Sequence, residues 1–140
     1  MKPPEQFRMG QQAKDQMITL KRSLGVMQWN HLCRWGFCLS LQDPSPRDLR
    51  EPPADSNVEM TFKTFAGRYE QIYWALLVRR AIADGHPTDA DTLHRLLRVH
   101  IHRGVARLFG DKSLKTCAAL ARLALDEGAR KESRTRKVEK

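Results

Sequence analysis

The sequence has few cysteines and no long apolar run. Its three cysteines, Cys33, Cys38 and Cys117, do not make a disulfide framework, and an odd number is natural in a reducing cytosol. No apolar run approaches the roughly 20 residues that a membrane-spanning helix needs, and the first ten residues are too polar for a secretory signal. We therefore expect a cytoplasmic protein without a membrane partner.

The sequence also lacks the motifs of common catalytic and nucleotide sites. Neither GxxxxGK[ST] nor GxGxxG occurs, so nucleotide binding would lack its phosphate-binding loop. No CxxC pair is present, and Cys33 and Cys38 lie in an apolar segment, which favours buried packing over a redox or sulfur-carrying role. We predict no catalytic residue, no cofactor and no enzymatic activity. A DNA-nicking nuclease remains an alternative, although it would need an acidic or metal-binding cluster.

Acidic residues are fewer than basic residues in this sequence. The 140 residues contain 25 Lys and Arg against 16 Asp and Glu, which gives a formal net charge of +9. Such an excess favours polyanionic partners, namely DNA, RNA or an anionic membrane surface. A hydrophobic fraction of 41% is enough for a core, and the length fits a single domain.

Hydrophobic spacing predicts a mainly α fold with one or two short strands. Alternation predicts strands over 6–9 and 58–65, although a capping box at Ser56 and Glu59 is a competing helical interpretation of the second segment. Helices are predicted over residues 10–25 (ending at Gly25), 27–42, 67–85, 88–110 and 113–125. Residues 43–57 are rich in proline and charge and are expected to form a surface loop.

The helices 27–42 and 67–84 are apolar on more than one side. In a small chain, the second side of such a helix is expected to pack against another copy, so we predict an obligate oligomer. Expected boundaries are a flexible N-terminus over 1–5, a folded domain over 6–125 and a disordered charged tail over 126–140.

The segment "LHRLLRVHIHRGVARL" (93–108) suggests a metal site or a basic face. At about 100° per residue, its core stripe is formed by Leu93, Leu97, Ile101, Gly104 and Leu108. His94, His100 and His102 are six and two residues apart, so they cannot share an ion on one helix, and no metal site is predicted. His100 is expected at the edge of the core with a hydrogen-bond partner. Arg95, Arg98 and His102 are expected on an outer, basic face.

Two resemblances follow from these stretches. The order strand, helix, Gly turn, helix over 6–42 is similar to a ribbon-helix-helix unit, whose strands pair between two copies and which binds DNA. The chain also resembles the DndE family of small bacterial proteins for DNA sulfur modification (phosphorothioation). That resemblance rests on "QQAKDQMITLKR" (11–22), "WNHLCRWGFCLSL" (29–41), "PADSNVEMTFKTFAGRYEQIYWALL" (53–77) and "LHRLLRVHIHRGVARLFGDKSLK" (93–115).

The DndE resemblance implies a DNA-binding, non-catalytic subunit of the phosphorothioation machinery. It implies action beside a cysteine desulfurase, a sulfurtransferase and an ATPase, a preference for nicked duplex, and assembly as a homotetramer. The alternative is a ribbon-helix-helix transcriptional regulator that reads a specific operator, with Gln6 and Arg8 as its base-reading side chains.

Basic residues inside the matching stretches are the predicted contacts to DNA phosphates. Lys21 and Arg22 come first, and Arg34 is the least secure because its helix is expected to be buried. The full set is Lys14, Lys21, Arg22, Arg34, Lys63, Arg103 and Lys112.

Overall fold

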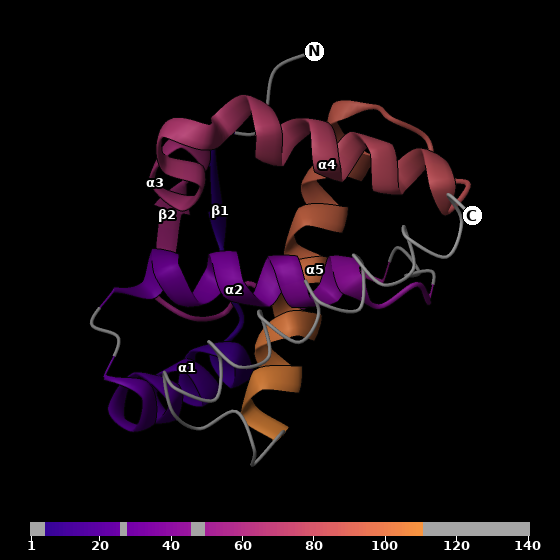
Figure 1. Ribbon diagram of the computed structural model, residues 1–140. Helices are drawn as coiled ribbons and strands as arrows, with labels where there is room; N and C mark the ends of the chain where they lie inside the picture. Colours follow the sequence, from indigo (N-terminus) through magenta and orange to yellow (C-terminus); the bar gives the residue numbers. More distant parts are fainter. Residues whose placement is uncertain (1–4, 26–27, 46–49, 111–140) are drawn as a thin grey trace, which may run out of the picture.

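A computed structural model describes residues 5–25, 28–45 and 50–110 (Figure 1). The described part is mainly helical with one two-stranded antiparallel sheet, which confirms the predicted fold class. Lys112, the helix predicted over 113–125 and the tail 126–140 lie outside the described residues. The elements are β1 (Gln6–Arg8), α1 (Gln11–Leu24), α2 (Trp29–Gln42), β2 (Glu59–Thr61), α3 (Phe62–Ala66), the 3-10 turn η1 (Gly67–Tyr69), α4 (Glu70–Ala83) and α5 (Ala90–Gly110).

The two strands pair within the chain. Phe7 of β1 lies opposite Met60 of β2, and both side chains point into the core, whereas the flanking strand residues are exposed. This alternation follows from the two-residue period of a strand. The predicted strand over 6–9 is therefore confirmed.

The second strand is shorter than its alternation predicts. The Thr61 hydroxyl accepts a hydrogen bond from the Thr64 backbone N–H, so a helix begins at Phe62. The competing capping box at Ser56 is wrong because the Ser56 hydroxyl donates to the Met9 carbonyl at 2.6 Å and accepts from Val58 N–H. Ser56 thus joins the β1–α1 connection to the loop that leads into β2.

Helix α1 has the amphipathic pattern that its sequence predicts. Its buried face consists of Ala13, Met17, Leu20 and Leu24. Gly25 ends the helix in the left-handed region, with φ of 70°, and its N–H bonds to the Lys21 carbonyl. That backbone conformation favours glycine, as the sequence analysis expects.

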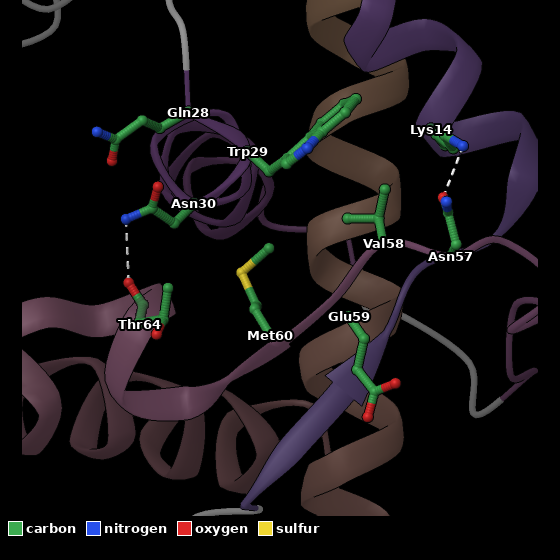
Figure 2. Close-up of a pocket in the computed structure, with 9 residues that line it drawn as sticks. All are labelled: Lys14, Gln28, Trp29, Asn30, Asn57, Val58, Glu59, Met60 and Thr64. Atoms are coloured by element: carbon green, nitrogen blue, oxygen red, sulfur yellow. Dashed lines mark hydrogen bonds between the residues drawn. The ribbon is translucent and has the colours of Figure 1, made fainter.

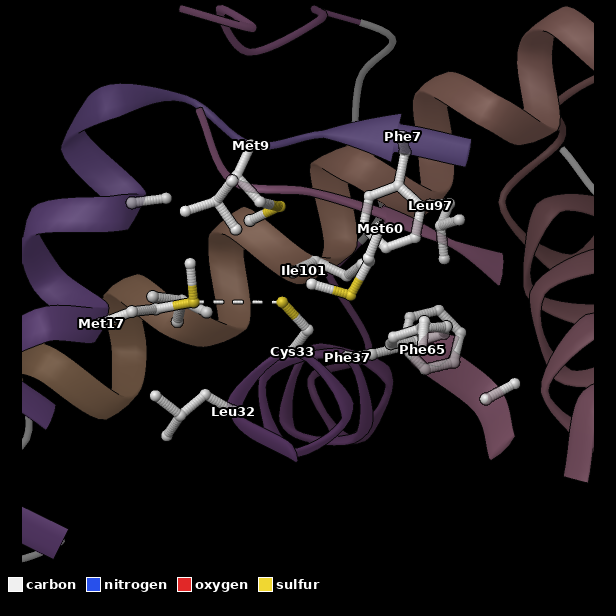
Figure 3. Close-up of a cluster of buried hydrophobic side chains, with 14 of the residues drawn as sticks. Phe7, Met9, Met17, Leu32, Cys33, Phe37, Met60, Phe65, Leu97 and Ile101 are labelled. Carbon is white, nitrogen blue, oxygen red and sulfur yellow. Dashed lines mark hydrogen bonds between the residues drawn. The ribbon is translucent and has the colours of Figure 1, made fainter. Parts of the chain in front are cut away.

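Helices α2 and α5 cross at the centre of the molecule (Figure 1). Gly36 and Gly104 form the crossing point, because a Cβ placed on Gly104 would lie only 1.5 Å from the Gly36 carbonyl oxygen. Figure 3 shows the apolar cluster around this crossing, with Phe37 and Cys33 of α2 facing Ile101 of α5 and Met17 of α1. The predicted core stripe of α5 is buried as expected.

Helix α4 covers the core with one face only. Leu77 and Ala81 are buried, whereas Ile72, Leu76 and Ile82 are 57%, 39% and 63% exposed. The apolar second face is therefore present as the sequence indicates, but within the described residues nothing covers it. Oligomerisation stays a prediction. Among the described helices, none is long and apolar enough to cross a membrane.

Candidate nucleic-acid interface

The prediction that Arg98 lies on an outer basic face of α5 is wrong. The side chain is 2% exposed. Its guanidinium donates to the backbone carbonyls of Arg8, Pro52 and Pro53 and to the carboxylate of Glu51, each at 2.7–2.8 Å. The segment 51–53 folds over this side of α5, so Arg98 holds that segment and the end of β1 together.

His102 is also part of this internal network. Its Nε2 accepts a hydrogen bond from the Gly10 N–H at 3.0 Å, and its Nδ1 donates to the Arg98 carbonyl at 2.6 Å. This pattern requires the neutral ring. Burial lowers the pKa of His102 below its ordinary value, with a smaller contribution in the same direction from the Arg98 charge. His102 therefore orders the start of α1.

This lowered pKa predicts a pH dependence of stability. Because the unfolded chain binds a proton at His102 more readily than the folded chain, the free energy of unfolding should fall as pH drops below about 6.5. The slope for one proton is at most about 1.4 kcal/mol per pH unit. Urea unfolding of wild type and His102→Gln from pH 8 to pH 5 would measure it. A wild-type curve parallel to that of the variant would contradict the role given to His102.

Arg103, a predicted phosphate contact, lies in a second internal network. Its Nε donates to the Ser40 hydroxyl at 2.7 Å, and its guanidinium also bonds to the Ser40 and Ser45 carbonyls. The Ser40 hydroxyl lies 2.7 Å from Nδ1 of the buried His100. His100 therefore has the hydrogen-bond partner that the sequence led us to expect, and this partner is Ser40. These bonds use the guanidinium of Arg103 to join α5 to the end of α2, which weakens the case for a phosphate contact there.

Arg34 is positioned in a similar way. Its Nε donates to the Phe65 carbonyl and its Nη2 to the Thr64 carbonyl, so it ties α2 to α3. The residue is half-buried beside the positive-φ Gly67. A structural role explains these contacts without a ligand, and the predicted phosphate contact at Arg34 stays a prediction.

Basic side chains gather instead on one flank of α1. Lys14 and Lys21 are seven residues apart, so they lie above one another on the helix, and Arg22 is exposed next to Lys21. Lys14 Nζ donates to the Asn57 side-chain oxygen at 2.6 Å, and Lys21 Nζ lies 4.1 Å from the centre of the Trp29 ring. Both ammonium groups are thereby held over the same region of the surface.

A groove of about 500 Å³ lies beside this flank (Figure 2). Trp29 and Asn30 at the start of α2 form one side, and the Met60 side chain projects from β2 toward this helix. Four stretches of the sequence build its walls, namely Lys14, Gln28–Asn30, Asn57–Met60 and Thr64. Amide, aromatic, thioether and ammonium groups therefore meet in one depression.

The charge of the groove is positive. Glu59 is its one carboxylate among the lining residues, and Arg8 forms an ion pair with it. Lys14 lines the groove, and Lys21 lies against its tryptophan wall. The Lys63 side chain is exposed on α3, next to the lining residue Thr64. An anionic ligand therefore meets cations at this site.

The sequence predicted Lys14 and Lys21 as phosphate contacts, but it did not single out Trp29 and Asn57 as residues of a groove. In the sequence, Trp29 is one of many apolar residues of the segment 27–42, and Asn57 belongs to a predicted surface loop.

The described residues offer little to metal or thiol chemistry. No group of three or more His, Cys, Asp or Glu within them is arranged to hold a metal ion. Burial raises the pKa of the Cys33 thiol to about 12 and raises that of Cys38 as well. Because the thiolate is the nucleophile, these two cysteines are poorly suited to sulfur transfer.

Comparison with known proteins places the chain in a family. The family model described as DNA sulphur modification protein DndE matches residues 6–116. The crystal structure of DndE from Escherichia coli B7A, involved in DNA phosphorothioation modification, superposes with a TM-score of 0.65 at 20% identity, covering 77% of this chain and 99% of that one. A crystal structure of a DndE G21/24K mutant gives 0.60 at 17% identity, covering 76% and 100%. No curated protein matches the sequence. The family match spans most of the chain, and we conclude that it belongs to the DndE family of DNA sulphur modification proteins.

Proposed function

We propose that the chain is a DNA-binding, non-catalytic component of a DNA phosphorothioation system. The observation that carries the proposal is the cationic flank of α1, where Lys14 lines the groove and Lys21 lies over its tryptophan wall. Arg22 is exposed beside Lys21 on the same helix. Phosphate contacts made by such side chains give affinity that is largely independent of base sequence. The formal net charge of +9 supports the same partner.

Four finer points belong to the same proposal. The DNA partner is duplex DNA, preferably nicked, and the protein partners are the sulfurtransferase and ATPase subunits of the system. The chain forms a homotetramer in the cytoplasm. The exposed apolar residues of α4, which include Ile72 and Ile82, support a self-association surface. The DNA-binding domain covers residues 6–125.

The predicted phosphate contacts differ in the support they receive. Four are retained, namely Lys14, Lys21, Arg22 and Lys63. Lys14 lines the groove and Lys21 lies over the Trp29 ring, whereas the other two are exposed on α1 and α3. Arg34 and Arg103 are ranked lower because their guanidinium groups bond to carbonyls of the same chain.

The alternative of a ribbon-helix-helix regulator gains no support from β1. In such a unit, the strand pairs with the strand of a second copy, whereas β1 here pairs with β2 of its own chain. Of its proposed base-reading side chains, Arg8 forms an ion pair with Glu59 and donates to the Ser56 carbonyl. Its guanidinium is thus used within the fold.

A double variant, Lys21→Ala with Arg22→Ala, tests the proposed DNA contacts. Each lost phosphate contact should lower the slope of log binding constant against log salt by about 0.9, so the pair should lower it by about 2. Fluorescence anisotropy of the full chain with a labelled duplex, at several salt concentrations, would measure this slope.

The matched control removes the same charge elsewhere. Arg79→Ala with Arg107→Ala changes two exposed arginines of α4 and α5. We expect this variant to keep nearly the wild-type slope. Equal slopes for wild type and the Lys21, Arg22 variant would refute the assignment to α1.

A further inference from the structure

We propose that the free edge of β2 takes up an extended, acidic segment of a partner protein as a third strand of the sheet. The segment would lie in the groove beside α1 and belong to a protein subunit of the same modification system. The inference deepens the proposed function and rests on it for the identity of the partner, because it names the surface at which that partner would bind.

The register of the sheet shows which backbone groups of β2 face away from β1. The Met9 N–H donates to the Val58 carbonyl at 2.9 Å, just beyond one end of the ladder. Hydrogen-bonded and non-bonded pairs alternate along an antiparallel ladder, so Met60 bonds to β1 whereas Glu59 and Thr61 do not. Within the described residues, the two outward N–H groups and the Glu59 carbonyl have no hydrogen-bond partner.

The groove lies along this free edge. Figure 2 shows β1 on one side of the segment 57–60 and the start of α2 on the other, with the groove between α2 and the segment. An extended chain rises by about 3.3 Å per residue, so three or four residues are enough to cover β2. Unpaired N–H and C=O groups at a sheet edge are a template for a strand of another chain.

The charges around the groove favour an acidic segment. Lys14 lines the groove, Lys21 lies against its tryptophan wall, and Lys63 is exposed on α3. Glu59 is the one carboxylate among the lining residues, and it is paired with Arg8. These cations also suit DNA phosphates, but the outward row of backbone N–H and C=O groups matches a polypeptide and has no counterpart in a nucleic acid.

The start of α2 supports an acidic partner independently of the lysines. Gln28 provides no side-chain cap, and the first turn of α2 contains no acidic residue. The residues at this helix end, Gln28, Trp29 and Asn30, line the groove. The first N–H groups of a helix lack intrahelical partners and favour a nearby negative charge. An Asp or Glu of the added strand can supply that charge.

The test uses the full chain and overlapping short peptides that cover the sulfurtransferase and ATPase subunits. Fluorescence anisotropy of the labelled peptides should identify acidic segments that bind wild type. Glu59→Pro removes the outward N–H without removing a bond of the β1–β2 ladder. We expect this variant to bind the same peptides about 10-fold more weakly or worse, because the added strand loses a hydrogen bond and meets the proline ring.

Matched variants separate the N–H from other effects. Glu59→Ala removes the same carboxylate but keeps the N–H, and it should bind the acidic peptides at least as tightly as wild type. Gln6→Pro places a proline on the opposite edge of the sheet, where the N–H also faces outward, and its affinity should stay within about 2-fold of wild type. N-methylation of the peptide needs no variant of the protein: methylation of every second amide should abolish binding, and methylation of the amides between should be tolerated.

Amide hydrogen exchange gives a second measurement on wild type. In the free protein, the Met60 N–H is bonded to β1 and should exchange slowly, whereas Glu59 and Thr61 should exchange fast. A bound peptide should slow exchange at Glu59 and Thr61 by about 10-fold or more. Unchanged exchange at both residues in the peptide complex would contradict strand addition.

The outcomes distinguish this inference from the proposed function. Equal peptide affinities of wild type and Glu59→Pro would overturn the edge site, and so would the failure of every peptide to bind wild type. If Glu59→Pro weakens duplex binding and no peptide binds, the groove belongs to DNA. If it changes only the oligomeric state in size-exclusion chromatography, a second copy occupies the edge. Wild type that binds the peptides as expected but no duplex at low salt would refute the DNA contacts alone.

Discussion

Substituting Gly104 by alanine is expected to abolish stable folding or to lower the free energy of unfolding by at least about 4 kcal/mol. The added Cβ would lie 1.5 Å from the Gly36 carbonyl oxygen and 2.1 Å from its carbonyl carbon. These are backbone atoms of α2, so no side-chain rotation can relieve the overlap. The two central helices would have to separate, and the apolar cluster around their crossing would lose its packing.

Gly110→Ala is the control on the same helix. A Cβ at Gly110, the last residue of α5, meets nothing within 4 Å among the described residues. Because alanine has the higher helix propensity, this variant should keep or slightly raise the stability. Urea unfolding followed by circular dichroism compares the two. If Gly104→Ala unfolds at the same urea concentration as wild type, the close crossing of α2 and α5 is wrong.

The apolar stripe of α5 could be predicted from spacing, but the crossing could not. Helical periodicity places Gly104 among Leu97, Ile101 and Leu108, and all of these are buried. Which residue meets Gly104 depends on how α2 lies across α5. Gly36 is 68 positions away, and no local pattern in either helix encodes that distance.

The role of Arg98 could not be predicted for a related reason. At about 100° per residue, it lies about 100° from the centre of the core stripe, at the flank of the helix, where a charged side chain is ordinarily exposed to solvent. The segment 51–53 covers it through hydrogen bonds to backbone carbonyls, which any sequence can provide. A sequence therefore shows on which side of a helix a residue lies, but not whether a loop returns to that side.

The candidate site was predictable on α1 and unpredictable elsewhere. Lys14 and Lys21 share a flank because seven residues make nearly two helical turns, and the structure places both at the groove. The groove itself needs Asn57 and Met60 from a segment more than thirty positions later. Trp29 carried no separate signal, because its helix contains two tryptophans and several other apolar residues.

Arg98→Ala is expected to lower the free energy of unfolding by about 3–5 kcal/mol. The variant would leave the carbonyls of Arg8 and of the 52–53 segment without their buried donor, and Glu51 without its closest cation. Lysine at this position should rescue little, because one ammonium cannot reach the carbonyls and the carboxylate that the planar guanidinium bonds. The 51–53 segment should also become more accessible to proteolysis, since Arg98 bonds it to α5.

Arg95→Ala provides the comparison that separates a buried cation from an exposed one. Arg95 lies one turn earlier on α5, its side chain is 51% exposed, and its contact with Glu51 is 3.8 Å long. Its removal should cost less than about 1 kcal/mol. Urea unfolding of both variants at pH 7, with limited proteolysis of the native proteins, measures the difference. Similar midpoints for the two variants would mean that segment 51–53 does not enclose Arg98 in solution, and that the basic outer face expected from the sequence exists after all.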